Sequence, residues 1–597
     1  MKILNKCSLV VISALFAAAG LANATQPPDV VNSDSSDNTA MGTSALLDLT
    51  SGTGNTASGE SALESNTTGN DNTAVGYAAL NGNTTGGDNT AVGVNSLSAN
   101  TSGGTNSSFG AAALQSNTTG SENTAAGSFA LSSNTTGSYN AAVGSNALSS
   151  NTTGSENTAT GPSALAGNTS GGYNTASGYA ALQANTTGYE NTASGASALA
   201  LNTSGGFNTA SGYSALASNT NASYNTASGY NALFHNTTGG QNTATGASAL
   251  ESNTSGNSNT ASGFQALFSN TTGGNNTATG EGALQFNTTG TSNTASGYSA
   301  LALNTTGSLN TAEGQYALYG NTSGDDNTAF GYEALTSNTI GNYNHASGYF
   351  ALHNNSSGSQ NSASGVQALY GNKTGNYNTA SGTDALFSNT TGSTNIAAGY
   401  KAGYNLTTGS NNVDIGNLGV AAESGTIRIG TTSTQTKTFI AGIYGTSVTG
   451  STVVVSSTGQ LGVTVSSERF KTAIAPMAST SEKLQQLRPV TFKLKSDATG
   501  TRQFGLIAEE VAKVYPELVI RNESGRIDGV RYDELAPMLL NEVQQQQQKI
   551  AAQAAEIRSL KARQKEFATQ AELANLKQAL HAALLKMQSA DALVANR

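Results

Sequence analysis

The stretch NTAVGYAALNGNTTGGD, residues 72–88, is one copy of a 17-residue unit that fills more than half of this 597-residue chain. Its first Asn recurs every 17 residues from Asn38 to Asn412, 23 times without a miss, and a Gly lies four places after each one, from Gly42 to Gly416. A period held without insertion means that one structural unit stacks on copies of itself. Each position of the unit therefore forms a column along the molecule.

The unit is too short for a pair of helices with turns, and each copy carries two turn signals that contain Gly. Short strands joined by tight turns fit this pattern. The predicted fold class is therefore mainly β: residues 38–416 form a long β-solenoid, or β-roll, in which one copy is one coil. A Leu column runs from Leu46 to Leu386, and a second Asn column runs from Asn66 to Asn389.

The apolar content of each coil is small. A copy usually offers one Leu and two Ala for burial. The stabilisation from burying them has to exceed the loss of conformational entropy, which costs roughly 1 to 2 kcal/mol for each backbone residue. Two features are expected to compensate. The Asn columns can form amide ladders from coil to coil, and three chains can bundle so that their Leu columns face a shared interior.

The pattern Asn-x-Ala-x-Gly followed by Ala resembles the β-roll head repeats of trimeric autotransporter adhesins over residues 38–416. The resemblance implies a trimeric rod that is exposed at a cell surface. Those adhesins end in a membrane-embedded β-barrel, which needs outward-facing apolar strands of about 9 to 11 residues. This chain ends otherwise, so we expect no integral membrane anchor.

Residues 1–24 read as a secretory signal peptide. Lys2 and Lys6 precede an apolar stretch over residues 9–19, and Ala22-Asn23-Ala24 forms a small-x-small cleavage site,. Residues 25–37 then form an N-terminal segment. The prediction is a secreted or cell-surface protein without disulfides, because the single cysteine, Cys7, is removed with the signal peptide,.

The composition limits the kinds of molecule that we expect this chain to bind. The net charge is -10 with only 10% charged residues, and no basic stripe suggests nucleic acid,. We expect a host-surface glycan or protein as the partner of the rod, and no cofactor or metal. An aromatic side chain often follows the repeat Gly, which predicts a ladder packed coil on coil, with sugar stacking as the alternative. These residues are Tyr77, Tyr179, Tyr213, Tyr230, Phe264, Tyr298, Tyr332 and Tyr349.

The period is lost after Gly416. Short β-branched runs over residues 417–465 predict a β neck,. From Ser466 charged residues become frequent, and Ile507, Val511 and Val514 have helical spacing between short apolar runs, which predicts a small α+β domain,.

Five motifs follow one another in this domain: S-x-x-R-x-K at 466–471, L-x-P-V-x-F at 487–492, G-x-I-A-x-E-V at 505–511, P-E-L-V at 516–519 and V-x-Y-x-x-L at 530–535. Together they resemble the C-terminal intramolecular chaperone domain of bacteriophage endosialidase tail spikes, over residues 466–565. The resemblance implies a domain that trimerises, templates folding of a β-structured fibre and then cuts itself off through a Ser-Lys dyad. It makes Ser466 the nucleophile, Lys471 the base, and the bond between Val465 and Ser466 the scissile bond. The family usually has Asp after the serine, where this chain has Ser467.

The chemistry of such a dyad has clear requirements. A serine hydroxyl attacks only when a neighbour takes its proton, and an amine does so only when it is neutral, a form that burial favours. No histidine lies between His353 and His581, which excludes a histidine-based triad within the compact domain. We therefore expect a single-turnover serine endopeptidase with no activity on other substrates. The alternative is an exposed Ser and Lys at a turn, with Ser466 capping a helix.

The C-terminal residues 541–597 predict a coiled coil that overlaps the end of the chaperone domain. Apolar residues recur at heptad spacing, interrupted over residues 561–570, and a single amphipathic helix is the alternative. The heptad residues are Val543, Ile550, Ile557, Leu560, Phe567, Leu573, Leu580 and Met587.

Two rival functions stay open for the rod. One is a glycan-degrading fibre like the tail spikes, although acids such as Glu60, Asp88 and Glu156 are scattered and not paired,. The other is an ice-binding or crystal-binding solenoid, in which Thr columns present a flat periodic array. Turn formation gives the Thr columns a simpler use.

Overall fold

A computed structural model describes residues 32–441, 452–456, 458–522 and 524–594. The signal peptide predicted for residues 1–24, and the residues after it up to 31, lie outside this part. The chain divides into two units, Met1–Phe439 and Ile440–Arg597. Each unit is described by itself.

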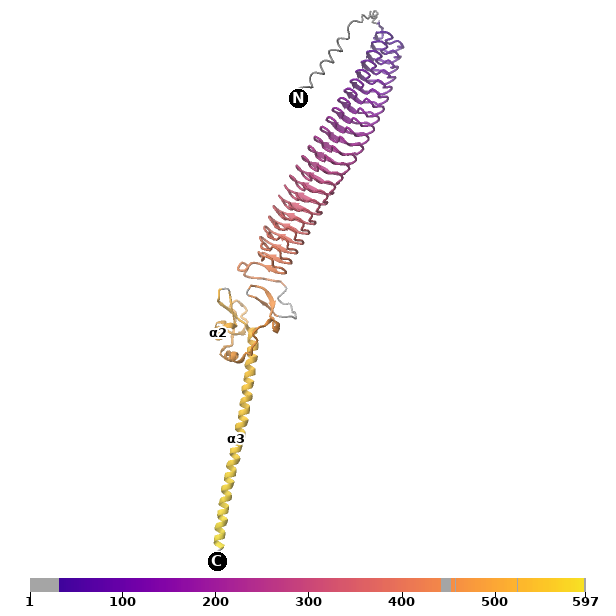
Figure 1. Cartoon of the computed structure of the whole chain (residues 1–597). Helices are drawn as coiled ribbons and strands as arrows, with labels where there is room; N and C mark the ends of the chain where they lie inside the picture. Colours follow the sequence, from indigo (N-terminus) through magenta and orange to yellow (C-terminus); the bar gives the residue numbers. More distant parts are fainter. Residues whose placement is uncertain (1–31, 442–451, 457, 523, 595–597) are drawn as a thin grey trace, which may run out of the picture. The chain divides into compact units, whose positions relative to one another are not determined.

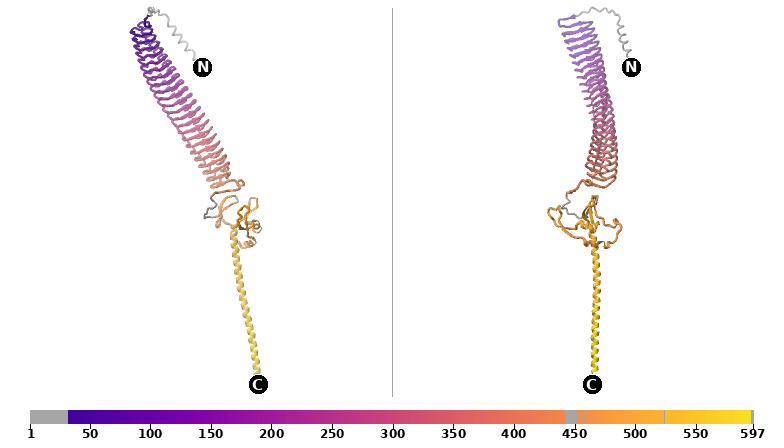
Figure 2. Two further views of the ribbon diagram at one scale, coloured as in Figure 1. Left: turned by 180° about the vertical axis from the view of Figure 1, so that it is seen from behind. Right: turned by 90° about the vertical axis from the view of Figure 1, so that its left-hand side faces the viewer.

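The first unit is a β-solenoid of 17-residue coils, as predicted (Figure 1). Each coil contributes one three-residue strand, and the strands of neighbouring coils pair in parallel with equivalent residues opposite each other, such as Thr175 with Thr192. The two residues Asn32–Ser33, ahead of the coils, pair antiparallel with the first of these strands. The strands lie in one sheet that runs the length of the stack (Figure 2). They are β1 (Asn32–Ser33), β2 (Thr39–Met41), β3 (Thr56–Ser58), β4 (Thr73–Val75), β5 (Thr90–Val92), β6 (Ser107–Phe109), β7 (Thr124–Ala126), β8 (Ala141–Val143), β9 (Thr158–Thr160), β10 (Thr175–Ser177), β11 (Thr192–Ser194), β12 (Thr209–Ser211), β13 (Thr226–Ser228), β14 (Thr243–Thr245), β15 (Thr260–Ser262), β16 (Thr277–Thr279), β17 (Thr294–Ser296), β18 (Thr311–Glu313), β19 (Thr328–Phe330), β20 (His345–Ser347), β21 (Ser362–Ser364), β22 (Thr379–Ser381), β23 (Ile396–Ala398), β24 (Val413–Ile415) and β25 (Ile427–Ile429).

Positions 1 to 17 of a coil are counted from its first Asn, so that Asn72 is position 1 and Asp88 is position 17. The core consists of Ala at positions 3 and 8 and Leu at position 9, which are fully buried within the single chain, as Ala74, Ala79 and Leu80 illustrate. The expectation that Leu columns face one another between chains is therefore wrong. A left-handed backbone at position 9, with φ 52° at Leu80, accompanies the inward placement of the Leu side chain.

Two Asn ladders run along the solenoid, as the sequence predicts. At position 1, the Asn72 side chain donates to Asn55 Oδ1 at 3.1 Å and to the carbonyl of Gly86 at 2.9 Å. At position 12, Asn83 donates to Asn66 Oδ1 at 2.8 Å and also to Gly86. These amides are buried, and burial is tolerable because their polar groups have partners,. The ladder at position 12 ends at Asn389, whose Oδ1 has no partner.

Close approach of neighbouring coils explains the two Gly columns. A Cβ added at Gly76, position 5, would lie 2.5 Å from the carbonyl oxygen of Gly93, and φ there is 135°. A Cβ added at Gly86, position 15, would lie 2.3 Å from the carbonyl oxygen of Gly103. Backbone atoms cannot yield to such contacts, so position 15 also excludes a side chain by space alone. Ala222 is nevertheless at position 15.

The last two coils, which begin at Asn395 and Asn412, have a different interior. Gly403 occupies the Leu position and Leu406 the Asn position, while Asp414 occupies an Ala position and reaches the space beside Gly403 and Gly419. Asp414 is 1% exposed, and neither of its carboxylate oxygens has a hydrogen-bond partner among the described residues. Burial is the main cause that raises its pKa to about 6.

The solenoid sheet continues beyond residue 416. Arg428 on β25 is the strand partner of Asp414, and it pairs with Glu423 at 2.8 Å. Part of the segment predicted as a neck, residues 417–465, therefore belongs to the solenoid, and another part forms the antiparallel hairpin of β26 (Val453–Val455) and β27 (Leu461–Val463) in the second unit.

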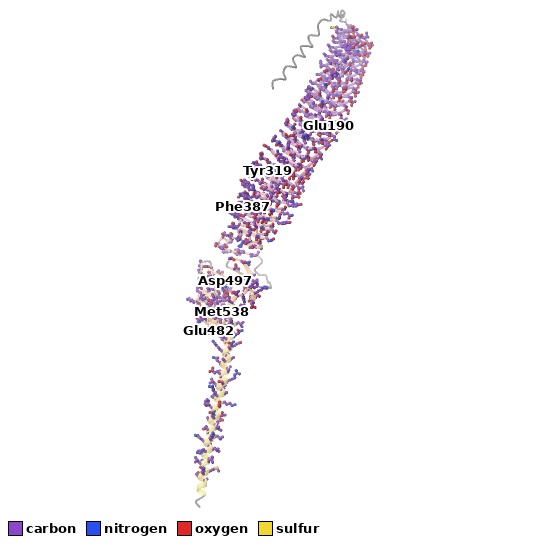
Figure 3. The ribbon with its side chains drawn as sticks, in the orientation of Figure 1. Glu190, Tyr319, Phe387, Glu482, Asp497 and Met538 are labelled. Atoms are coloured by element: carbon purple, nitrogen blue, oxygen red, sulfur yellow. The ribbon has the colours of Figure 1, made fainter. Side chains whose placement is uncertain are left out.

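The rest of the second unit is a small α+β fold, as predicted. Its elements are η1 (Glu468–Phe470), η2 (Ala478–Gln486), the hairpin β28 (Val490–Phe492) with β29 (Gln503–Gly505), α2 (Ala508–Val514), η3 (Pro516–Leu518), the hairpin β30 (Val519–Arg521) with β31 (Ile527–Val530), and α3 (Tyr532–Val594). The buried core residues are Val511, Tyr515, Leu518, Val519, Val530, Leu535 and Met538. The first turns of α3 thus belong to this core, and Met538 is labelled in Figure 3.

The remainder of α3 is a long single helix (Figure 1). Every residue from Gln546 to Ala590 is exposed, including Ile550 at 63% and Phe567 at 69%. Its apolar side chains are therefore not covered by any of the described residues. Among the described residues, no helix has the length and apolar character that a membrane crossing requires.

Candidate functional site

The two predicted site residues lie on either side of a single 3-10 turn. Ser467 precedes η1, and Lys471 ends it with an extended backbone while its N–H donates to the carbonyl of Glu468. This turn brings the Lys471 side chain back along the chain to Ser466. The distance from Lys471 Nζ to Ser466 Oγ is 3.3 Å.

The pair is open to solvent. Ser466 and Lys471 are both exposed, and Val465, on the other side of the predicted scissile bond, is 56% exposed. The single chain therefore supplies contact between the hydroxyl and the amine without the enclosure that favours a neutral amine. Nothing in the described part of the chain covers the pair.

The alternative reading made Ser466 a helix cap. The residue at the N-cap of η1 is Ser467, and its side chain makes no capping hydrogen bond. The Ser466 hydroxyl instead accepts a hydrogen bond from Lys471.

A hydrogen bond from a backbone to a tyrosine explains two of the motifs that follow. Tyr532 Oη accepts the N–H of Leu506 at 2.8 Å. A Cβ added at Gly505 would lie 2.6 Å from the same oxygen. The Gly of the third motif thus leaves room for the Tyr of the fifth. Sequence reasoning named both motifs but not this contact.

Other contacts fix the segments that follow the dyad. Arg488 of the second motif forms a two-pronged ion pair with Glu510 of α2, with one N–O distance of 2.6 Å. The Tyr515 hydroxyl donates to the carbonyl of Thr480 in η2 at 2.9 Å. Asn541 of α3 donates to Ser481 Oγ at 2.6 Å. The domain is thereby tied to the start of α3.

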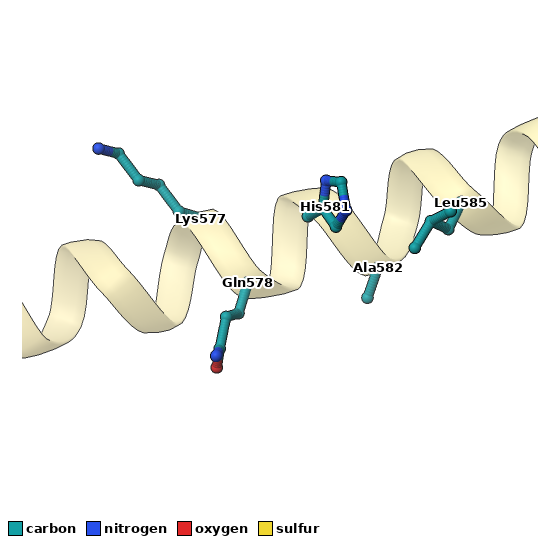
Figure 4. A pocket seen from close by; sticks show the side chains of 5 residues that line it. All are labelled: Lys577, Gln578, His581, Ala582 and Leu585. Atoms are coloured by element: carbon teal, nitrogen blue, oxygen red, sulfur yellow. The ribbon is translucent and has the colours of Figure 1, made fainter.

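The described residues contain no cluster of His, Cys, Asp or Glu that could hold a metal ion. A shallow hollow lies on one side of α3, between Lys577, Gln578, His581, Ala582 and Leu585 (Figure 4). All of its lining comes from one helix, so it encloses no substrate.

The aromatic column of the rod is a partly exposed ladder. Tyr213 stacks on Tyr230 with ring centroids 5.6 Å apart, and Tyr332 stacks on Tyr349 at 5.4 Å. Tyr213 and Tyr230 keep 56% of their surface exposed. Packing between coils therefore buries only part of the surface of each ring.

The Thr columns differ in use. At position 13, the Thr84 hydroxyl donates to the carbonyl of Thr101 in the next coil at 2.9 Å, as expected for turn chemistry. At position 2, on the exposed side of the strands, hydroxyls such as that of Thr192 make no hydrogen bond with any described residue.

Comparison with protein families matches residues 466–520 to the family described as chaperone of endosialidase (Peptidase_S74). The match begins at Ser466 and does not include the repeats. Comparison with curated proteins gave no match. The C-terminal region therefore carries a chaperone domain of the self-cleaving peptidase type, preceded by a β-solenoid, which together fit a fibre of the tail-spike kind.

Proposed function

We propose that this chain is the subunit of a secreted trimeric surface fibre, an adhesin, whose C-terminal domain drives assembly and then cuts itself off between Val465 and Ser466. The observation that carries the proposal is the 3.3 Å contact between Lys471 Nζ and Ser466 Oγ at the first residue of the chaperone family match. The rod is the product of assembly, and residues 466–597 are the part that is released.

The reaction uses one residue twice, because Ser466 supplies both the attacking oxygen and the nitrogen of the bond that breaks. Neutral Lys471 takes the hydroxyl proton as Oγ adds to the carbonyl carbon of Val465. Collapse of the five-membered adduct breaks the C–N bond, and the proton passes to the departing nitrogen. Val465 is then an ester on Ser466 Oγ, and water hydrolyses it to a carboxylate and the free hydroxyl.

Assembly is proposed to supply the enclosure that a single chain lacks. The apolar heptad residues of α3 are exposed in one chain, and three parallel helices would bury them against one another. Three chaperone domains would then meet beside the start of α3, and a neighbouring chain would cover Lys471 and favour its neutral form. Cleavage would follow completed assembly.

The mass of the expressed full-length protein tests the reaction. Wild type is expected to yield two fragments that separate between Val465 and Ser466, whereas Ser466→Ala and Lys471→Ala are expected to stay intact. Ser496→Ala and Lys513→Ala, which alter exposed residues of the same domain, are the matched controls and should cleave like wild type. Intact wild type, or cleavage of Ser466→Ala at the same bond, contradicts the proposal.

A second candidate for the rod is binding to ice or another crystalline surface. The observation that favours it is the column of exposed position-2 hydroxyls without hydrogen bonds, which extends along many coils. Thermal-hysteresis measurement on the purified protein tests it. A solution that freezes and melts at one temperature excludes it.

A further inference from the structure

Position 17 of the coil alternates between acidic and aromatic side chains over six consecutive coils, and the seventh coil adds another aromatic side chain. This edge stripe consists of Glu122, Tyr139, Glu156, Tyr173, Glu190, Phe207 and Tyr224. Glu190 is labelled on the rod in Figure 3. The stripe differs from the aromatic column at position 6, and neither chain assembly nor cleavage uses it.

The backbone at position 17 is uniform. Every residue of the edge stripe has a left-handed φ, between 53° at Glu190 and 64° at Tyr224. The N–H of each bonds to the preceding coil, as in Tyr139 to Ser121 at 3.1 Å and Tyr173 to Ser155 at 3.1 Å. All side chains of the stripe therefore leave a fixed backbone from equivalent points.

Packing within the fold accounts for Phe207 and Tyr224, whose rings stack with centroids 4.9 Å apart. It does not account for Tyr139 and Tyr173. A left-handed backbone favours Gly, Asn or Asp, and other coils do use Asp71, Asp88 and Asn275 there. Tyr139 and Tyr173 are 58% and 60% exposed, and neither ring contacts another aromatic ring in the described part of the chain. These rings gain little packing in exchange for an unfavourable backbone, and such a mismatch points to function.

The carboxylates hold the phenols that lie beside them. Glu122 beside Tyr139 and Glu156 beside Tyr173 are the main cause that raises the pKa of each phenol. The edge stripe presents ring faces, hydroxyl donors and carboxylate acceptors side by side.

The spacing of the rings suits a chain that lies along the rod. Coils are about 4.8 Å apart, so rings in every second coil are about 9.6 Å apart, a span of the order of one disaccharide. The same spacing returns further along position 17, where Tyr343 and Tyr377, each 60% exposed, flank Gln360.

We propose that the edge stripe binds an extended neutral glycan, with sugar rings stacked on Tyr139 and Tyr173 and their hydroxyls donating to Glu122, Glu156 and Glu190. The charge of the site selects against anionic glycans, since the stripe has three carboxylates and the chain has a net charge of -10,. A protein partner fits less well, because carboxylates interrupt the apolar surface that such an interface would bury.

This inference rests on the proposed role of the rod in surface attachment, and it assigns that role a site. The test is affinity electrophoresis of the full-length protein through gels that contain neutral polysaccharides, namely mannan, galactan, dextran and hydroxyethyl cellulose, with polygalacturonate as the acidic counterpart. We expect retardation by at least one neutral polymer and none by polygalacturonate. Tyr139→Ala with Tyr173→Ala should weaken this binding about tenfold or more.

The matched control is Tyr179→Ala with Tyr213→Ala. These two tyrosines are also two coils apart, lie at position 6 and are 63% and 56% exposed. The control should bind like wild type. Absence of binding to every neutral polymer, binding to polygalacturonate alone, or equal loss in both double variants overturns the inference. Self-cleavage is measured separately by mass, so failure of the glycan site is distinguishable from failure of the proposed function.

Discussion

Lys471 Nζ lies 3.3 Å from Ser466 Oγ in a single chain, and both side chains are exposed. The two groups that we propose to react are thus in contact within one chain. The contact lacks a surface that covers the amine, and burial is what favours a neutral amine. Contact without enclosure is what the proposed coupling of cleavage to assembly predicts.

The first prediction concerns the coupling of cleavage to α3. Replacing Ile550 and Ile557 with Asp, far along the exposed part of the helix, should give monomers that stay uncut, because charge in a coiled-coil seam prevents the helices from packing. Light scattering and intact mass measure the two effects. Gln548→Asp, which adds charge to the polar surface of the same turn, is the control. Monomers that cut themselves at the wild-type rate would show that assembly is not required.

The second prediction concerns the ester. Hydroxylamine added to wild type during maturation should trap Val465 as a hydroxamate, because the reagent attacks an ester far faster than an amide. The trapped fragment should be about 15 Da heavier than the hydrolysed one, because hydroxylamine replaces water as the nucleophile that opens the ester. Mass spectrometry detects this difference. Lys471→Ala should give no hydroxamate. Cleavage without any trapped product argues for direct attack by water.

The third prediction tests Gly505 against Tyr532. Gly505→Ala should destabilise the domain by about 1 to 3 kcal/mol, because its Cβ would lie 2.6 Å from Tyr532 Oη,. Tyr532→Phe removes the oxygen and leaves the Leu506 N–H without its partner. The two changes together should cost less than their sum, which denaturant unfolding of the Ser466→Ala background can measure. Additive losses would mean that the two residues do not contact each other.

The sequence predicts the solenoid well because its period is a property of every coil. The columns of Asn and Gly can be recognised from their spacing alone, and the contact of Asn72 with Asn55 follows directly from that spacing. The inward direction of Leu80 was not predictable in this way, since it depends on a left-handed backbone that Leu rarely adopts. Bundling of chains was expected to bury the Leu column, but the structure buries these side chains within a single chain.

The features of the candidate site were likewise predictable from the sequence only in part. Spacing alone allows Ser466 and Lys471 to meet across one turn, and a resemblance to a known family gave them roles. The contact between Gly505 and Tyr532 spans residues that are remote in sequence, so that only the folded domain reveals it. The edge stripe was not predicted from the sequence. Glu156 counted there as one of several scattered acids, but it belongs to a column at position 17. Only the structure shows the exposure and the backbone conformation of that column.

The fourth prediction concerns Ala222, the residue at position 15 where the other coils have Gly. A Cβ at position 15 meets the carbonyl of the next coil. Among the described residues, Asn225 makes no hydrogen bond to Gly239 like the bond from Asn72 to Gly86. Asn236 donates to Asn219 Oδ1 at 3.1 Å. Ala222→Gly should close this gap and increase amide exchange protection over residues 219–242. Gly205→Ala, which creates the same conflict elsewhere, should reduce protection locally. Equal protection in wild type and Ala222→Gly contradicts the explanation.

The last prediction concerns pH and the terminal coil. Burial raises the pKa of Asp414 to about 6 from a model-compound value of 3.8, so between these values the folded chain holds a proton that the unfolded chain has lost. Stability of the coil therefore falls as pH rises through this window, and above about pH 6 the buried charge costs about 3 kcal/mol relative to low pH. Glu423 adds to the cost and Arg428 offsets part of it.

Asp414→Asn should then protect the amides of residues 413–430 from hydrogen exchange at pH 8 and have little effect at pH 4, each compared with wild type at the same pH. Asp88→Asn, at an exposed position, controls for the loss of one charge. A gain in protection that is equal at both values of pH would show that shape, and not protonation, governs this end of the solenoid.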